Sequence, residues 1–458
     1  MARFSLRWML GTCCLLAAAV AGAADGVRPI GLARVDITPQ YPVRMTGYAG
    51  RANEFEGVEQ RLWAKAMAIG SDEEGPAVIV TVDNLGVPGS MTDEVAARVA
   101  KKYPLVREKF VVCASHTHCG PQVAGVAPLI TQGELPADQQ AHIQQYTRDL
   151  ADYLEKVTLA ALAERKPGRL DWASGSVDFA VNRRRISGGK VSFGMTPGGP
   201  VDHALPMLRV TDPEGKLRGL LINYACHCTT LGGKFNRICG DWAGYAQEII
   251  EREHPGVTAM ISIGCGADAN PQPRDELVYA QLHGQSIARE AKRLLAGPWT
   301  PINGQLTARL ERIELPFDTL PSREEFAARA KEKGPIAYHA QVNLARLERG
   351  ESLPTKLPYV IGTWCWGDEL AMVFLAGEVV VDYDLRLKHE LDGRRLWVTA
   401  YANDDPCYIA SRRVLAEGGY EVDSSMYYYD RPTHFAPAVE DLIIGTVEKM
   451  VPSSYAAR

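Results

Sequence analysis

Two kinds of hydrophobic pattern alternate along the chain and predict an α/β fold. Short runs rich in β-branched residues are typical of strands, and longer stretches with an apolar residue every three or four positions are typical of amphipathic helices. The expected strands are 29–37, 63–70, 76–83, 109–115, 206–211, 218–225, 258–264, 305–315, 359–365, 370–376 and 395–401. The expected helices are 91–103, 138–165, 242–254, 279–296, 322–332, 337–349, 378–390 and 435–450.

The stretches between these elements do not divide the chain into separate domains. Residues 184–202 and 350–358 are punctuated by glycine or proline and are expected to be loops. Polar motifs are scattered from residue 116 to residue 420, and one site built from them needs one folded body. We therefore expect a single large α/β domain of mixed β-sheets layered with helices, with its site at converging strand ends.

The N-terminal segment has the pattern of a signal peptide. Arg3 and Arg7 precede the apolar run 8–20, and small residues follow at 21–24. The alternative is a membrane anchor, but the run is shorter than the ~20 residues that a spanning helix needs. We expect cleavage after about residue 24 and export of residues 25–458 to the periplasm or the medium. No later stretch has the length and apolar character of a membrane span.

Composition limits the possible partners and raises a question about the cysteines. A formal net charge of -5 over 458 residues offers no electrostatic basis for binding nucleic acid.

Eight cysteines remain after the signal segment, and in an oxidising compartment they could form disulfides or act as small packing residues. Their spacing is not that of a structural zinc site. The pattern carries no information on oligomeric state.

Histidines follow two of the expected strands. His116 and His118 come after the strand 109–115, and alternation along an extended backbone would place both on one face. His227 follows the strand 218–225 in the same way. Each could be a hydrogen-bonded loop residue when taken alone. Three imidazoles delivered by strand ends instead indicate one shared centre.

Carboxylates and a glycine-rich turn occur at comparable positions. Asp241 precedes an expected helix, where it could be the N-cap or a group that orients a metal ligand. The segment 263–271 passes from a strand into a loop whose glycines would allow close approach of the backbone. Glu378 comes just after the strand 370–376, as a candidate ligand or as a favourable acid in a first helical turn.

Together these motifs resemble the neutral/alkaline ceramidase family. The similar pieces, in the same order as in the family, are Ile30–Pro39, Met45–Ala49, Ser115–Pro121, Asn182-Arg183, Asn223–Thr229, Gly240-Asp241, Asp268–Pro271, Gly377-Glu378, Asn403, Tyr408 and Tyr420-Glu421. They span nearly the whole mature chain. Their shared order is far more specific than any one of them.

The resemblance implies a zinc-dependent hydrolase that cleaves an N-acyl amide by attack of zinc-bound water. The residues matching the family's zinc ligands are His116, His227, Glu378 and Tyr408. His118 matches a residue that donates a proton to the leaving group, Tyr420 one that stabilises the oxyanion, and Arg183 one that contacts the scissile region. The expected partner is a small-molecule or lipid substrate with an acyl bond.

The chain also departs from the family pattern. Asn270 stands where the family has a serine, so we expect it to contact the substrate and to alter the choice of substrate. Cys119 likewise replaces a serine. The last expected helix ends close to residue 458, so no C-terminal immunoglobulin-like domain is expected. The alternatives are a zinc hydrolase acting on an ester or a modified sugar, and a catalytically silent envelope binding protein on the same fold.

Overall fold

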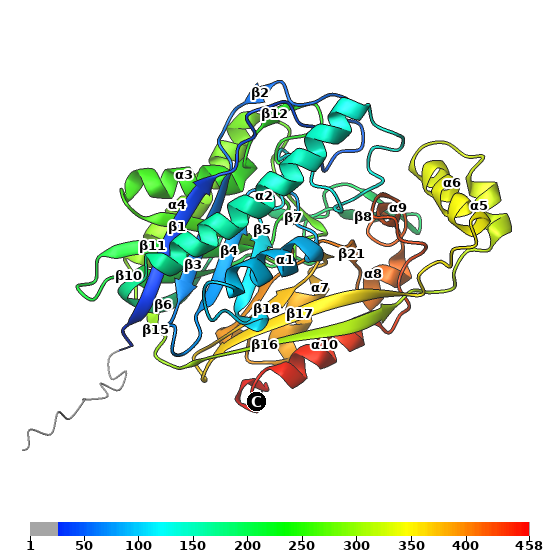
Figure 1. Cartoon of the computed structure of the whole chain (residues 1–458). Coiled ribbons are helices and arrows are strands. Elements are labelled where there is room, and N and C mark those ends of the chain that lie inside the picture. Colours follow the sequence, from blue (N-terminus) through cyan, green and yellow to red (C-terminus); the bar gives the residue numbers. More distant parts are fainter. Residues whose placement is uncertain (1–25, 458) are drawn as a thin grey trace, which may run out of the picture.

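The structure is a computed structural model that describes residues 26–457, and it confirms the α/β class (Figure 1). The expected signal segment, residues 1–24, lies outside the described residues. Within 26–457 two large β-sheets, several two-stranded sheets and the covering helices form one folded body, as the motif spacing predicted.

The larger sheet has nine strands. Along its length the order is β13 (Thr258–Ile263), β11 (Leu217–Tyr224), β10 (Ala204–Thr211), β6 (Lys166–Ser176), β1 (Arg28–Asp36), β3 (Trp63–Ile69), β4 (Ala77–Val82) and β5 (Phe110–Ala114), with β15 (Thr300–Pro301) on β6. The pairs β11–β13 and β4–β5 are parallel and the other pairs are antiparallel. The sheet is therefore mixed, as expected.

Helices cover the outer face of this sheet. They are α1 (Gly89–Ala100), α2 (Ala137–Ala163), α3 (Asp241–Glu253) and α4 (Leu277–Leu295). Figure 1 shows α2 running across β1 and β3, and these elements are in contact. A side chain at Gly31 of β1 would lie 1.8 Å from the carbonyl oxygen of Ala161, so only glycine allows the helix to pack this closely.

The smaller sheet packs on the inner face of the larger one. Its order is β16 (Leu306–Pro316), β17 (Lys356–Trp366), β18 (Leu370–Leu375) and β20 (Leu396–Thr399). Buried aromatic and apolar side chains from both sheets form one hydrophobic cluster, which includes Trp364, Trp397, Met67 and Met260. On the far side α10 (Val439–Met450) packs on β16 and β17 and contacts α7 (Asp382–Glu390). The result is four layers in the order helix, sheet, sheet, helix.

Shorter elements complete the chain. They are β2 (Gly57–Val58), η1 (Arg107–Lys109), β7 (Ala180–Asn182), β8 (Arg184–Ser187), β9 (Lys190–Phe193), β12 (Arg237–Ile238), β14 (Ala269–Pro271), α5 (Arg323–Arg329), α6 (Pro335–Glu348), β19 (Glu378–Val379), η2 (Gly393–Arg395), β21 (Tyr408–Ile409), α8 (Arg412–Glu417), α9 (Ser424–Tyr428) and η3 (Ser453–Tyr455). Several of them lie where the strands of both sheets end.

The two edges of the larger sheet approach each other, because β13 also contacts β4 and β5. The segment after β20 lies between these edges. Its residue Ala400 donates a backbone hydrogen bond to Ile263 at the end of β13, and Tyr401 accepts one from Ala114 at the end of β5. Strand ends that are far apart in the sheet order therefore converge on one region.

Every expected strand is present close to its expected range, but three features differ. Strand β6 was not expected, because Pro167, Gly168 and Gly175 obscure its alternating pattern. The segment 184–202 is not only a loop, since it contains the β8–β9 hairpin. The helix expected at 378–390 begins at Asp382, because Glu378 pairs with Tyr408 as part of β19 and β21.

The eight cysteines from Cys113 to Cys407 are all buried, and none forms a disulfide within the described part of the chain. Their burial agrees with the packing interpretation. No helix within residues 26–457 has the length and apolar character needed to cross a membrane.

Candidate metal centre

Three buried histidines meet where strands of the larger sheet end. His116 and His118 follow β5, and His227 follows β11. One ring nitrogen of each lies within 4.8 Å of one ring nitrogen of both others. The prediction that strand ends bring these residues together is confirmed.

The backbone at His116 does not follow the expected alternation. Strand β5 ends at Ala114, and His116 has a φ of 55°, in the left-handed region that is uncommon for residues with a Cβ atom. The rings of His116 and His118 still meet, with their Nε2 atoms 3.2 Å apart, because the chain turns at this point. Left-handed residues held by their surroundings are frequent at functional sites.

Backbone carbonyl groups fix the protonation of two of the rings. Nδ1 of His116 lies 2.8 Å from the carbonyl oxygen of Leu85, and Nδ1 of His227 lies 2.9 Å from that of Gly266. Because a carbonyl can only accept, each Nδ1 carries the hydrogen and each Nε2 presents a lone pair. The Arg183 guanidinium, which can only donate, lies 3.2 Å from the His227 Nε2 and agrees with this assignment.

Oxygen donors from the separate two-stranded sheet of β19 and β21 complete the cluster. Glu378 and Tyr408 sit side by side because β19 and β21 pair in parallel at these two residues. Oε2 of Glu378 lies 3.2 Å from the His116 Nε2 and 3.1 Å from the His227 Nε2. The Tyr408 hydroxyl lies 3.3 Å from the His227 Nε2. Both residues are buried.

These donors fit a bound cation. Nε2 lone pairs of His116 and His227 face a carboxylate oxygen of Glu378, an arrangement that is repulsive unless a positive charge lies between them. Donors bound tetrahedrally to zinc at about 2.0–2.1 Å lie roughly 3.3–3.4 Å from one another, close to the separations observed. Imidazole and oxygen donors are also a suitable set for Zn²⁺.

The ionisation of the cluster agrees with this donor set. Burial, reinforced by Arg183, lowers the pKa of His227 to about 4. His227 is therefore neutral near pH 7, which is the form of an imidazole that binds a metal.

His118 differs from the other two histidines. Its Nδ1 atom is buried without a hydrogen-bond partner among the described residues, whereas metal-ligating histidines usually donate their second N–H to a carbonyl or carboxylate. Its ring lines a cavity next to the cluster and lies 4.8 Å from the ring of Tyr48. Burial, with the neighbouring His116 and His227, lowers the pKa of His118 well below its usual value.

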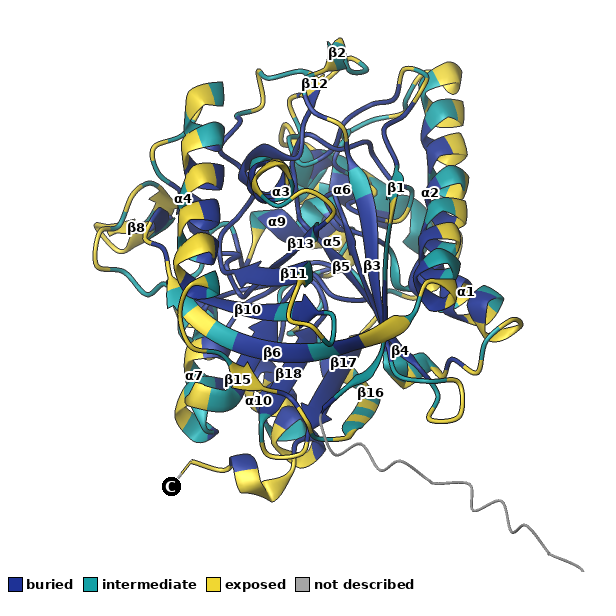
Figure 2. Cartoon of the chain, turned by 90° about the vertical axis from the view of Figure 1, so that its left-hand side faces the viewer, coloured by how far each residue is buried: buried dark blue, intermediate teal, exposed yellow. Residues whose placement is uncertain are grey.

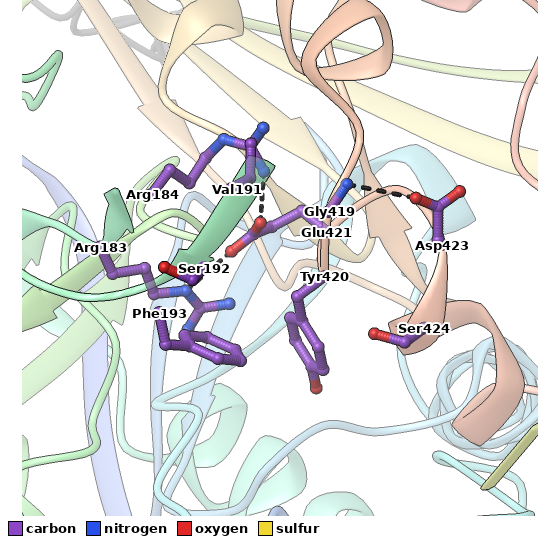
Figure 3. Close-up of a pocket in the computed structure, with 10 residues that line it drawn as sticks. All are labelled: Arg183, Arg184, Val191, Ser192, Phe193, Gly419, Tyr420, Glu421, Asp423 and Ser424. Atoms are coloured by element: carbon purple, nitrogen blue, oxygen red, sulfur yellow. Dashed lines mark hydrogen bonds and ion pairs between the residues drawn. The ribbon is translucent and has the colours of Figure 1, made fainter. Parts of the chain in front are cut away.

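Arg183 connects the cluster to a buried ion-pair network (Figure 3). Its Nε donates to Oε1 of Glu421 at 2.9 Å, and its Nη2 donates to the Tyr408 hydroxyl at 3.0 Å. Glu421 also accepts a hydrogen bond from Arg184, whose Nη2 donates to Glu417 at 2.9 Å. The Nε side of the Arg183 guanidinium is thus held by a carboxylate. Its Nη2 side contacts the cluster of candidate metal ligands.

The cavity beside the cluster has a volume of about 580 Å³ and is open to solvent. Its wall includes His118, Arg183, Asn270, Tyr408 and Tyr420. Oδ1 of Asn270 accepts hydrogen bonds from Arg183 and from the Thr229 hydroxyl, both at 3.3 Å. Residues expected to contact a substrate therefore share one cavity, and its volume is in the range of small-molecule sites.

Two tyrosines at the cluster were not singled out by the sequence patterns. The Tyr429 hydroxyl donates to Oε1 of Glu378 at 2.5 Å, so the carboxylate is held on both oxygens. The ring of Tyr401 lies 4.2 Å from the ring of His116. Tyr429 follows α9, a short helix that was not expected, so no pattern placed it near Glu378.

Two motifs near the cluster have structural roles. Asp241 is the first residue of α3 and not its N-cap, which is Gly240. Its carboxylate accepts a hydrogen bond from the backbone of Leu231 at 2.9 Å and does not contact the histidines. Asp268 accepts hydrogen bonds from the backbone of Val381, just before α7, and from the side chain of Asn182 in β7, so it holds these two segments together.

Comparisons of sequence agree with this arrangement. The family model described as neutral/alkaline non-lysosomal ceramidase, N-terminal, matches residues 29–311, which include all three histidines, Arg183 and Asn270. A neutral ceramidase of Pseudomonas aeruginosa is 25% identical over 346 residues, covering 71% of this chain and 50% of that protein. A neutral ceramidase of Drosophila melanogaster is 24% identical over 260 residues, covering 54% and 36%. The chain spans half or less of the length of these curated relatives.

Solved structures extend the likeness of fold to nearly the whole chain. The crystal structure of neutral ceramidase from Pseudomonas aeruginosa superposes with a TM-score of 0.71 at 20% identity, covering 95% of this chain and 76% of that one. A ceramidase complexed with C2 gives a TM-score of 0.70 at 18% identity, covering 95% and 77%. With the family match over residues 29–311, these findings show that the chain belongs to the neutral/alkaline non-lysosomal ceramidase family.

Proposed function

We propose that the protein is a zinc-dependent hydrolase of N-acyl amide bonds, with His116, His227, Glu378 and Tyr408 as the metal ligands. The single observation that carries this proposal is the meeting of the two Nε2 lone pairs with the Glu378 carboxylate at 3.1 and 3.2 Å. A zinc ion held there would polarise the acyl carbonyl and bring the pKa of a bound water toward about 7.

His118 is proposed to take a proton from the attacking water and to pass it to the leaving nitrogen, because its lowered pKa leaves the ring neutral near pH 7. Cleavage of an amide needs this proton, because an unprotonated amine anion is a poor leaving group. His118 lines the cavity, and its Nε2 lies 3.2 Å from the Nε2 of His116. It is therefore adjacent to the metal donors while its ring still borders the space where a substrate would bind.

Arg183 and Tyr420 are proposed to position the acyl group and to stabilise the charge on its oxygen. Both line the cavity, and the Arg183 guanidinium lies 5.6 Å from the centre of the Tyr420 ring. Donors that are fixed before the reaction stabilise developing negative charge without reorganising. The Arg183–Glu421 ion pair supplies that fixation.

We further propose that residues 25–458 act as one catalytic domain of an exported enzyme, with a small-molecule or lipid substrate. The names of the relatives point to ceramide and related N-acyl lipids as the first compounds to examine. Asn270 in the cavity wall is the residue that we expect to modify this preference.

The proposal is tested by removing and restoring the metal. Protein treated with a chelator should lose hydrolysis of an N-acyl amino alcohol and regain it with one equivalent of zinc. His227→Ala should bind no zinc, whereas His142→Ala, which changes a half-buried histidine outside the cluster, should behave as wild type. Zinc-independent hydrolysis, or zinc binding that survives His227→Ala, would contradict the proposal. The ester of the same acid tests whether an ester is the better substrate.

A further inference from the structure

The hairpin formed by β8 and β9 stands at the mouth of the cavity. Figure 2 shows it projecting from the body of the molecule, with most of its residues exposed. Phe193 at the end of β9 and Met195 just beyond it line the cavity together with Arg183. A surface that contacts this hairpin is therefore also next to the opening through which a substrate would enter.

Three apolar side chains of the hairpin and the residues just after it remain about half exposed. Ile186 is 54% exposed, Phe193 55% and Met195 53%. These three make up a third of the large apolar side chains that are exposed within residues 26–457. They lie within ten positions of one another, so the exposed apolar residues are concentrated here instead of being scattered singly.

The two faces of the hairpin differ in chemistry. Arg184 pairs with Phe193 and Ile186 pairs with Val191, so Ile186, Val191 and Phe193 share one face. The register places Arg185 opposite Ser192 and Lys190 opposite Ser187 on the other face. Arg185 and Lys190 are both exposed. The hairpin is thus amphipathic, with an apolar face and a basic polar face.

The charge of the hairpin contrasts with that of the whole chain. Residues 184–195 contain two exposed basic residues, Arg185 and Lys190, and no acidic one, whereas the full chain has a formal net charge of -5. An apolar face opposite a basic polar face is the combination that binds the interface of an anionic bilayer, where apolar groups enter the headgroup region and basic groups meet the lipid charge. A neutral or cationic partner would not use the basic residues.

The base of the hairpin is rigidly attached to the site. Arg184 is buried and held by Glu421, Glu417 and the carbonyl oxygen of Gly418. The Arg183 guanidinium packs 5.1 Å from the centre of the Phe193 ring, and the backbone of Gly194 donates to Arg183. The hairpin can therefore press against a surface without losing its position relative to the cavity.

We propose that the β8–β9 hairpin docks the protein on the surface of an anionic lipid bilayer, with the cavity mouth facing the lipid. The proposal concerns binding and does not depend on the proposed hydrolytic activity. It adds an interaction surface to the site, through Ile186 at the apolar face and through Arg185 and Lys190 at the basic face.

Vesicle sedimentation tests the proposal with full-length mature protein. We expect binding to vesicles made of equal amounts of phosphatidylglycerol and phosphatidylcholine, and much weaker binding to pure phosphatidylcholine. Ile186→Asp should lower vesicle affinity by about tenfold or more, since it puts a charge in place of an apolar side chain that would enter the bilayer. Arg185→Glu with Lys190→Glu should lower it at least about twentyfold, because each basic residue near an anionic surface contributes roughly fivefold.

Matched variants separate docking from general effects. Val106→Asp changes a valine that is 52% exposed and lies in another region, and Lys216→Glu with Lys292→Glu makes the same charge change on exposed lysines elsewhere. Both should bind vesicles almost as wild type does. None of the hairpin variants changes a residue of the proposed catalytic set, so hydrolysis of a water-soluble substrate should persist in all of them.

Two results would overturn the proposal. One is equal vesicle binding by wild type, Ile186→Asp and the hairpin charge variant. The other is a concentration-dependent dimer of the wild type that Ile186→Asp dissociates, which would make the hairpin an interface between two copies of the chain. Failure of hydrolysis in a wild type that binds vesicles would count against the proposed function alone.

Discussion

The guanidinium of Arg183 and the carboxylate of Glu421 form an ion pair inside the protein, with Nε and Oε1 2.9 Å apart. Their side chains are 6% and 2% exposed, so little water screens the pair. Glu421 follows Tyr420 directly in the chain, and Arg183 reaches the Tyr408 hydroxyl with its other end. One ion pair thus fixes the position of several groups on the cavity wall.

Replacing Glu421 should therefore impair catalysis without removing the metal. Glu421→Gln keeps a hydrogen-bond acceptor but loses the charge that fixes Arg183, and we expect kcat/KM to fall on the order of ten- to a hundredfold. Zinc content should stay at the wild-type level. Glu417→Gln is the matched control, because Glu417 pairs with Arg184 and Arg413 but not with Arg183. Equal losses in both variants would show a general structural effect.

His118→Ala should separate proton transfer from metal binding. The variant is expected to retain zinc and to lose about 10²–10⁴-fold in turnover, the usual contribution of a general acid. His116→Ala should lose the zinc itself. Measuring the zinc content and the turnover of both purified variants shows whether His118 transfers a proton or binds the metal. Loss of zinc from His118→Ala would make His118 a ligand and remove one residue from the proposed set.

Tyr429→Phe should weaken zinc binding although Tyr429 is not a proposed ligand. Its hydroxyl holds Oε1 of Glu378, and groups that orient metal ligands commonly contribute about 10–100-fold in metal affinity. Competition with a zinc-binding dye measures the change. Tyr427→Phe, two residues earlier and packed on His339, is the control and should bind zinc normally. Unchanged affinity in Tyr429→Phe would mean that Glu378 is oriented by other contacts.

Asn270 should bias the enzyme away from ceramide. Its carboxamide is larger than the serine of the family and is held by Arg183 and Thr229 in the cavity wall. We expect weak hydrolysis of ceramide and better hydrolysis of smaller or more polar N-acyl compounds, and Asn270→Ser should shift the ratio of kcat/KM values toward ceramide by about five- to a hundredfold. The idea fails if wild type cleaves ceramide efficiently and the serine brings no gain.

His339 should make the protein less stable in acid. Burial lowers the pKa of His339 to about 4, so the folded chain stays neutral where the unfolded chain takes up a proton near its usual pKa of about 6.5. Stability is therefore lost as pH falls from about 6.5 toward 4. His339→Leu cannot bind the proton in either state and should lose less unfolding free energy on acidification, by up to about 3 kcal/mol. Denaturant titrations of both proteins at the two pH values measure this, and parallel losses would contradict it.

Much of the fold could be predicted from the sequence because most strands and helices have clear hydrophobic periods. Strand β6 lies in the middle of the larger sheet, but its glycines and proline interrupt the alternation, so its pattern is weak. The β8–β9 hairpin was missed for the same reason, since a glycine pair at 188–189 looks like a loop.

The convergence of the histidines was predictable, but its geometry was not. Strand ends indicated that His116, His118 and His227 would meet, whereas the left-handed turn at His116 depends on contacts with segments far away in the chain. Glu378 was expected at the start of a helix. It instead pairs with Tyr408 in a two-residue ladder, which no local pattern encodes. Tyr429 reaches Glu378 across the fold and has no sequence signal of its own.

Anomalous diffraction at the zinc absorption edge from crystals of the zinc-loaded protein tests the central claim most directly. The account predicts one strong peak bound by His116 Nε2, His227 Nε2, a Glu378 oxygen and the Tyr408 hydroxyl, each at about 2.0–2.2 Å. His118 should lie beside the metal without ligating it. A peak bound by all three histidines and not by Tyr408, or no peak at this cluster, would contradict the account.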